Sequence, residues 1–372
     1  MLNRILQERL KNRHQENSFR KLSSDQELLD FTSNDYLGFA RSQELFRLIK
    51  DKVNTLPHRN GATGSRLLSG NSTYTEEVEQ KLASIFKSEA ALIFNSGYTA
   101  NQAVLSSIPQ KGDTILYDEL AHACMRDGAR LSHAKRFAFK HNDLSDIDKK
   151  LKAAEGNIFI AVESIYSMDG DSCPLRELVS LADQYNASII LDEAHSTGIL
   201  GPEGSGMAVQ ESLDQKIPVR IYTFGKAMGI HGACVAGSRD LIDYLINYAR
   251  PFIFTTAPTP HSIASIDCSF AHLSNNLTLQ DKLKQRIELF TSLSREYNLS
   301  RLGSNSQIQS MVIAGNDSVK NAAQRLQRKG YDVRPILSPT VAKGSERLRI
   351  CLHTFNADEE INGLVQELSA LA

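Results

Sequence analysis

The chain has 372 residues, of which 41% are hydrophobic, so it can bury a large core, and a disordered or fibrous protein is excluded. Its 42 basic and 43 acidic residues leave a formal net charge of -1, which predicts neither a nucleic-acid nor an anionic-membrane partner and favours a small-molecule ligand. The five cysteines form no CxxC pair, no apolar run reaches roughly 18 residues, and the N-terminus is charged throughout, so we expect a cytoplasmic protein with reduced thiols, no metal site and no membrane span.

The first 40 residues predict an arm with an amphipathic helix, because leucine and isoleucine recur at helical spacing from Leu2 to Leu10. From about residue 76, strand-like and helix-like segments alternate, which predicts an α/β fold with a mostly parallel sheet covered by helices. The predicted strands are short and apolar, as buried parallel strands are, and lie at 91–94, 114–117, 159–163, 188–191, 220–224 and 234–236. The predicted amphipathic helices include 76–86, 175–185 and 240–248.

After about residue 265 the pattern changes to that of a second, smaller α/β domain. Its predicted elements are helix, strand 308–313, helix 319–329, strand 347–352 and a final helix from Asp358. We therefore expect three parts, namely an N-terminal arm over 1–40, a large domain over 41–265 and a small C-terminal domain over 266–372.

Two reactive side chains follow predicted strands of the large domain. Asp192 comes directly after the run 188–191, and Lys226 follows the run 220–224 in a glycine-containing loop. Because ligands of open α/β sheets bind outside the carboxyl ends of the strands, we expect these side chains to converge. Pyridoxal 5'-phosphate (PLP) needs an amine for its aldehyde and a carboxylate that keeps its ring nitrogen protonated, so the pair predicts a PLP site. Taken singly, Lys226 also fits an exposed surface lysine and Asp192 a helix cap.

Other residues near these segments are candidates for cofactor binding, but their spacing alone does not decide their roles. The stretch Asn95-Ser96-Gly97-Tyr98 precedes a predicted helix, whose N-terminal amides can bind a phosphate. His195 can donate to the phenolic oxygen of PLP or cap the turn that follows it. His122 and Ser167 are uninformative on their own, and a partly buried structural histidine is the commoner case.

Two arginines of the small domain alternate with apolar residues on a predicted strand. Arg347 and Arg349 therefore share one face, and Leu348 lies on the other. One of them can bind a substrate carboxylate bidentately, or both can line an ordinary solvated strand face. Spacing does not choose between these interpretations.

Together these motifs resemble the α-oxoamine synthases. The resemblance covers the chain from about residue 30 to the C-terminus and is carried by Ser33-Asn34-Asp35-Tyr36-Leu37-Gly38, Asn95-Ser96-Gly97-Tyr98, Ser167-Met168-Asp169-Gly170-Asp171, Asp192-Glu193-Ala194-His195-Ser196-Thr197-Gly198 and Thr223-Phe224-Gly225-Lys226. It implies PLP fold type I, which is aspartate-aminotransferase-like, and a homodimer with shared active sites. It also implies a decarboxylative Claisen condensation of an amino acid with an acyl-CoA. The member with the most similar motifs uses alanine and pimeloyl-CoA in biotin synthesis.

The resemblance also implies a role for each candidate residue. The implied catalytic residues are Lys226 as Schiff-base lysine and acid/base, Asp192 as pyridinium partner, His122 as ring-stacking residue and His195, which with Ser167 contacts the phenolic oxygen. The implied phosphate ligands are Gly97, Tyr98, Thr223 and, from the other subunit, Thr255. Arg349, with Asn34 nearby, would hold the carboxylate of the amino acid.

Two positions bear on the substrate. His231 stands where we expect a small residue, and its imidazole could alter access of the acyl chain. Ser65 stands where glycine-using members tend to have threonine, which favours alanine or serine as the amino acid.

Three alternatives stay open at the level of sequence. Sister enzymes join serine to a palmitoyl thioester, or glycine to an acetyl or succinyl thioester. A PLP aminotransferase would release no CoA, and a PLP-fold protein that only binds ligand would turn nothing over. The acyl group, and the choice between a CoA and an acyl-carrier-protein donor, are likewise not set by the sequence, because apolar pockets discriminate single methylenes by only about 1–3 kcal/mol.

Overall fold

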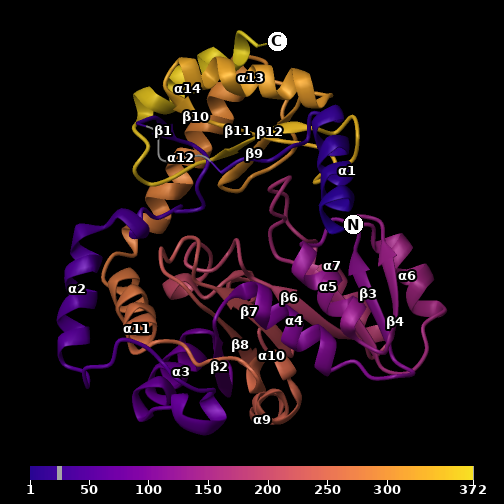
Figure 1. Ribbon diagram of the computed structural model, residues 1–372, viewed down its shortest axis with the longest axis vertical. Coiled ribbons are helices and arrows are strands. Elements are labelled where there is room, and N and C mark those ends of the chain that lie inside the picture. The colour runs from indigo at the N-terminus through magenta and orange to yellow at the C-terminus, as the bar shows by residue number, and fades with distance from the viewer. Residues whose placement is uncertain (23–26, 372) are drawn as a thin grey trace. The chain divides into compact units, whose positions relative to one another are not determined.

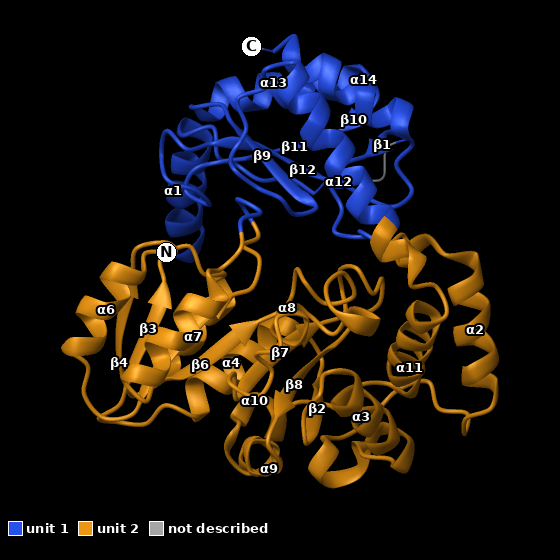
Figure 2. Ribbon diagram, turned by 180° about the vertical axis from the view of Figure 1, so that it is seen from behind, with its two compact units in different colours: residues 1–36, 168–171, 282–372 blue, residues 37–167, 172–281 orange. Residues whose placement is uncertain are grey.

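The computed structural model describes residues 1–22 and 27–371 of the chain (Figure 1). The chain divides into two compact units, coloured separately in Figure 2. The small unit contains residues 1–36, 168–171 and 282–372, and the large unit contains residues 37–167 and 172–281. These limits differ from the expected domain boundaries because the N-terminal residues join the C-terminal ones. Strand β1 (Leu29–Asp30) pairs in parallel with β10 (Tyr331–Asp332), so no separate arm domain forms.

The large unit is built on a seven-stranded sheet with the order β2-β8-β7-β6-β5-β3-β4. The strands are β2 (Ala90–Phe94), β3 (Thr114–Asp118), β4 (Lys135–Phe139), β5 (Ile158–Glu163), β6 (Ser188–Asp192), β7 (Val219–Thr223) and β8 (Ala233–Gly237). The six predicted strands are all present, each boundary within one residue of the expected one, and only β8 runs antiparallel to its neighbours. The predicted mostly parallel α/β fold is confirmed.

The helices of the large unit pack on both faces of this sheet. They are α2 (Gln43–Asn54), α3 (Thr73–Ile85), α4 (Gly97–Ser107), α5 (Ala123–Leu131), α6 (Leu144–Lys152), α7 (Leu175–Gln184), α8 (Met207–Gln210), α9 (Arg239–Tyr248), α10 (Arg250–Ile253) and α11 (Pro260–Ser274), with short turns η1 (Phe39–Arg41), η2 (Arg66–Gly70) and η3 (Pro202–Gly204). Alternation along the strands places Ile190 and Ile221 in one apolar cluster with α4, α5, α9 and α10. Serine side chains begin several of these helices, and the Ser96 hydroxyl accepts from the Thr99 N–H at the start of α4.

The small unit has an antiparallel sheet with the order β11-β12-β9. Its elements are α1 (Leu2–Gln15), α12 (Thr278–Glu296), which starts in the large unit, β9 (Ile308–Val312), α13 (Asn316–Arg328), β11 (Arg334–Ile336), β12 (Arg347–Cys351) and α14 (Asp358–Ser369). Leu348 and Ile350 of β12 lie in the apolar core with α13 and α14, so Arg347 and Arg349 share the other face as predicted. The apolar side chains of α1 stay exposed, with none of its residues buried. Among the helices of the described residues, none is both long and apolar enough to cross a membrane.

Candidate active site

The candidate site lies where parallel strands of the large unit end. In the sheet register Glu163 at the end of β5 is opposite Asp192 at the end of β6, and Asp192 is in turn opposite Ile221 of β7. Phe94 of β2 and Thr223 of β7 are both opposite Ala233 of β8. The last residues of β2, β5, β6 and β7 therefore lie along one edge of the sheet, as an open α/β sheet requires for a ligand site.

Asp192 is buried and fixed by two donors. Its side chain is 4% exposed, and its Oδ2 accepts from Asn101 Nδ2 at 2.6 Å. Its Oδ1 accepts from the Ala194 N–H at 2.8 Å. Asn101, one turn into α4, also donates to the Gly97 carbonyl at 3.1 Å, so it ties the start of α4 to the end of β6. A buried carboxylate held in this way is placed to accept from a ring N–H.

The start of α4 and the end of β7 form a small polar cup. A Cβ atom added to Gly97 would lie 2.3 Å from Thr223 Cγ2, so only glycine allows this approach. Thr223 Oγ1 is buried, and among the described residues it has no hydrogen-bond partner. A helix N-terminus beside a buried hydroxyl that lacks a partner suits a bound anion, so the cup fits the phosphate of PLP.

Thr255 lies beside this cup within the same chain. Asn95 Nδ2 is 3.3 Å from Thr255 Oγ1 and donates to the Thr256 carbonyl at 2.9 Å. The Ala257 N–H donates to the Gly64 carbonyl at 3.0 Å, which brings the loop of Ser65 to the same segment. Thr255 and Ser65 are thus joined to the start of α4 through hydrogen bonds within one subunit.

Lys226 is half-buried in a tight loop after β7. The Gly229 N–H donates to the Lys226 carbonyl at 2.8 Å, and the Ile230 N–H donates to the Phe224 carbonyl at 3.0 Å. Gly229 has φ of 65°, and a Cβ atom there would lie 2.3 Å from the Ala40 N atom. This glycine therefore sets the backbone of the lysine loop. His231, in the same loop, is exposed.

Lys226 and Asp192 act electrostatically on the same two neighbours, His122 and Glu163. Burial lowers the pKa of His122, Asp192 raises it and Lys226 lowers it further. Burial raises the pKa of Glu163 to about 8, the Asp192 carboxylate adds to the rise, and Lys226 opposes it. The His122 N–H donates to Glu163 Oε1 at 2.6 Å. The structure thus brings these four titratable side chains into one cluster.

Replacing Glu163 with glutamine is expected to flatten the pH dependence of the free energy of unfolding. The folded-state pKa of Glu163 lies above its ordinary value of 4.5, so its contribution to stability is complete below that pH and is lost as the pH rises through about 8. The groups that set this pKa are Asp192, Lys226, Asp118 and the backbone of His122.

Glu163→Gln protein, which cannot ionise at this position, should gain roughly 2–4 kcal/mol relative to wild type between about pH 5 and 9. Urea unfolding of both proteins across that range measures the difference. The exposed Glu177→Gln serves as control. Parallel stability curves for wild type and Glu163→Gln would contradict the assignment.

The other predicted residues of the large unit lie around this cluster. His195 is 3% exposed, in the turn that follows Asp192. This turn is anchored by the buried Glu193 carboxylate, which accepts from the Met207 and Ala208 N–H groups at 2.9 and 2.8 Å. Tyr98 is exposed, and its ring meets His122 edge-on with the ring centroids 6.4 Å apart. Ser167 is half-buried, shortly after β5.

The predicted carboxylate-binding residues belong to the small unit. Arg349 NH2 donates to Asn34 Oδ1 at 2.9 Å, and the Tyr36 hydroxyl donates to the same oxygen at 2.9 Å. Arg347 is buried and forms an ion pair with Asp169. Arg347 thus pairs with the carboxylate of Asp169, and Arg349 contacts the amide oxygen of Asn34, the residue that was predicted to lie near it.

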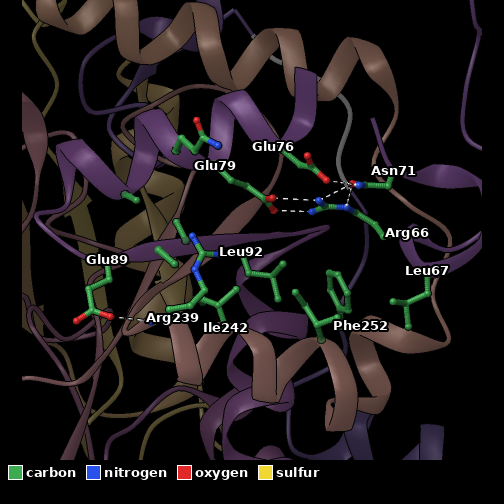
Figure 3. Close-up of a pocket in the computed structure, with 15 residues that line it drawn as sticks. Arg66, Leu67, Asn71, Glu76, Glu79, Glu89, Leu92, Arg239, Ile242 and Phe252 are labelled. Carbon is green, nitrogen blue, oxygen red and sulfur yellow. Dashed lines mark hydrogen bonds and ion pairs between the residues drawn. The ribbon is translucent and has the colours of Figure 1, made fainter. Parts of the chain in front are cut away.

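A separate pocket of about 280 Å³ lies in the large unit (Figure 3). Arg66 donates to both carboxylate oxygens of Glu79, at 2.5 and 3.0 Å, and to Asn71 Oδ1, while Glu79 Oε1 also accepts from the Ile93 N–H at 2.7 Å (Figure 3). The charges of Arg66 and Glu79 at this end of the pocket are therefore paired with each other. The network therefore anchors the loop that carries Ser65 onto α3 and β2.

Sequence reasoning missed Asn101 and Glu163, which the structure places in the cluster. Asn101 is a buried amide in a helix whose other buried residues are mostly small or apolar, and this contrast was the available signal. Glu163 ends a buried strand just as Asp192 does, so the same argument that selected Asp192 applies to it.

Comparison with known proteins gives consistent results. The family model described as aminotransferase class I and II matches residues 26–368. The 8-amino-7-oxononanoate synthase of Emericella nidulans is 41% identical, covering 92% of this chain and 88% of its own length. The solved 8-amino-7-oxononanoate synthase of Francisella tularensis is 28% identical with a TM-score of 0.80, covering 93% of this chain and 98% of that one. A solved SPT with PLP as an internal aldimine is 26% identical with a TM-score of 0.86, covering 92% of this chain and 86% of that one.

Proposed function

Because the chain belongs to the class I and II aminotransferase family, with 8-amino-7-oxononanoate synthases among its relatives at 35–41% identity, we propose that it is a PLP-dependent C-acyltransferase of this kind. Its reaction condenses L-alanine with pimeloyl-CoA and yields an aminoketone, CoA and CO2, as in biotin synthesis. The observation that carries this proposal is the common sheet edge shared by Lys226, Asp192 and the Gly97–Thr223 cup. The resemblance to the α-oxoamine synthases agrees with these relatives.

In this proposal, different residues of the large unit bind the ring nitrogen and the phosphate of PLP. When bound, PLP supplies an electron sink for negative charge at the substrate Cα. The Asp192 carboxylate, fixed by Asn101, accepts from the ring N–H. The start of α4 at Gly97 and Tyr98, with the Thr223 hydroxyl and Thr255 of the partner subunit, holds the phosphate.

Two histidine side chains and one serine side chain complete the cofactor pocket in this proposal. The imidazole of His122 would lie against the face of the ring. His195 and Ser167 donate to the phenolic oxygen, which stabilises charge there. These roles are the ones that the resemblance implies, and the three residues follow β3, β6 and β5.

Lys226 moves the proton in the proposed reaction. Its Nζ takes the proton from the alanine Cα, and a bond then forms between that carbon and the acyl carbon of the thioester. CoA leaves as a thiolate, which takes a proton from solvent to become the thiol, and the carboxylate leaves as CO2. Lys226 Nζ then returns its proton to Cα, so the reaction consumes one proton overall.

A CoA-release assay tests the proposal. Alanine, serine and glycine are each paired with pimeloyl, palmitoyl, acetyl and succinyl thioesters of CoA. The pimeloyl group is also presented on acyl carrier protein, where the released carrier thiol is measured in place of CoA. We expect the highest kcat/KM with alanine and a pimeloyl thioester. A higher value with another pair would identify a sister enzyme. Accumulation of pyridoxamine phosphate without CoA release would identify an aminotransferase, and no turnover with any pair would favour a ligand-binding protein.

Arg349 is proposed to hold the alanine carboxylate, with Asn34 as its neighbour. Replacing Arg349 with lysine removes the bidentate fork while keeping the charge, so KM for alanine should rise about 10- to 100-fold with a smaller change in kcat. Steady-state kinetics with alanine varied measure this. Arg328→Lys, at an exposed position of α13, is the control. An unchanged KM in Arg349→Lys would remove this residue from the site.

We also propose that the protein is a homodimer with shared active sites, in the cytoplasm. Exposed apolar side chains gather on η2 and around α10, namely Leu67, Leu68, Tyr248 and Phe254, at 50, 85, 63 and 74% exposure. Sedimentation should give twice the chain mass of 41.2 kDa for wild type and a monomer for Leu68→Glu. Leu131→Glu, at another exposed position, is the control. A monomeric wild type, or a dimeric Leu68→Glu protein, would contradict this interface.

A further inference from the structure

His122 occupies the N-cap position of α5, and its side chain takes part in the cap. Nδ1 accepts from the Cys124 N–H at 3.3 Å, and Cys124 Sγ lies 2.9 Å from the same nitrogen. A backbone N–H can only donate, which favours an unprotonated Nδ1, but at 3.3 Å this bond is long. The thiol is the nearer donor to Nδ1, and the two donors together place the ring proton on Nε2.

The main chain of His122 is held separately. Its N–H donates to Glu163 Oε1 at 2.6 Å, and Glu163 is fully buried at the end of β5. Because Glu163 is in register with Asp192 on β6, this bond ties the turn before α5 to the strand that ends at the pyridinium partner. Ring and backbone of His122 are thus each fixed by a buried side chain.

We propose that Cys124 and Glu163 are positioning residues that keep His122 as a neutral imidazole with its proton on Nε2. Cys124 orients the ring and Glu163 orients the backbone. A neutral imidazole can lie against a protonated pyridine ring, whereas an imidazolium would repel it. This benefit for PLP binding rests on the proposed function.

The surroundings of His122 favour this state. The N-terminus of α5 carries partial positive charge, which disfavours an imidazolium at the cap. Burial lowers the pKa of His122; Asp192 and Asp127 oppose this effect, and Lys226 and Arg126 add to it. Burial raises the pKa of the Cys124 thiol above its usual range, so the sulfur keeps the proton that it donates.

Nitrogen-15 NMR of the imidazoles in the PLP-loaded protein tests the role of Cys124. His122→Gln assigns the signal, and a pH titration reads the tautomer and the pKa. Wild type should show the Nε2-protonated form and no imidazolium at neutral pH. In Cys124→Ala, the Nδ1-protonated or charged form should rise at least threefold, and Cys124→Ser, whose hydroxyl can donate in place of the thiol, should restore the wild-type signal.

A wild-type signal in Cys124→Ala, or a Cys124→Ser protein that resembles Cys124→Ala, would overturn the role of Cys124. If Cys124→Ala does not fold, the wild-type tautomer and the Cys124→Ser signal still decide, since an Nδ1-protonated wild type excludes the proposal.

The role of Glu163 is tested through the affinity for PLP. Glu163→Gln keeps an oxygen acceptor for the His122 N–H and should bind PLP within about threefold of wild type, whereas Glu163→Ala should bind it about tenfold more weakly or worse. Equal dissociation constants for the two variants, or loss of affinity in both, would overturn this role. These readouts do not depend on turnover. A protein with the expected His122 signal but no condensation activity would therefore reject the proposed function and leave the positioning of His122 standing.

Discussion

Replacing Lys226 with alanine is expected to lower CoA release from pimeloyl-CoA by about 10³-fold or more, because it removes the amine that takes and returns the Cα proton. The large unit holds the lysine loop through backbone bonds, the Gly229 N–H to the Lys226 carbonyl and the Ile230 N–H to the Phe224 carbonyl, and these do not involve the lysine side chain. The variant should therefore fold with the loop intact. The expected loss is one of chemistry and not of structure.

Borohydride reduction of the PLP-loaded protein followed by peptide mass spectrometry gives an independent readout. The mass of the cofactor should appear on the Lys226 peptide of wild type and on no peptide of Lys226→Ala. Lys216→Ala, which removes an exposed lysine paired with Asp183, should leave both activity and labelling unchanged. Labelling at another lysine, or CoA release by Lys226→Ala within tenfold of wild type, would reject Lys226.

The strands of the large unit could be predicted from sequence because they are buried on both faces. Ile158–Glu163 and Ser188–Asp192 read as continuous apolar runs, and the structure confirms them. The edge strand Lys135–Phe139 was missed because most of its side chains are exposed and two of them are basic, which leaves no apolar run. The domain limits depend on pairing between distant segments, such as Leu29 with Tyr331, and no local pattern encodes such a pairing.

The candidate site was predictable to the extent that its residues follow strands. Asp192 and Lys226 were found in this way, since the carboxyl ends of parallel strands share one edge. Asn101 lies inside a helix, and its role depends on a hydrogen bond to Asp192 across 91 residues of chain. The contact between Cys124 and His122 is local in sequence, but it needs the helix cap geometry that only coordinates provide. Partners of this kind orient the predicted residues, and they are fixed by packing and not by motif.

Replacing Asp192 with asparagine is expected to lower kcat by about 10²–10³-fold and to weaken PLP binding, because a neutral amide cannot keep the pyridine ring protonated. Asparagine matches aspartate in size, so the change removes charge with little change in volume. Both carboxylate oxygens of Asp192 now accept from donors, Asn101 Nδ2 at 2.6 Å and the Ala194 N–H at 2.8 Å. The amide nitrogen of the new asparagine would therefore face one of these donors. Asn101 Oδ1, which has no hydrogen-bond partner among the described residues, can accept after a flip of its amide, at the cost of the bond to the Gly97 carbonyl.

The double variant Asp192→Asn/Asn101→Asp separates charge from position at this site. It restores a carboxylate within hydrogen-bond distance of residue 192 but moves the charge onto α4, away from the end of β6. If the position of the carboxylate matters, the double variant should stay at least tenfold below wild type in kcat while its PLP affinity partly recovers. Asp183→Asn, at an exposed position, is the control for charge alone. A single Asp192→Asn variant within threefold of wild type in both kcat and PLP affinity would reject Asp192 as the partner of the ring nitrogen.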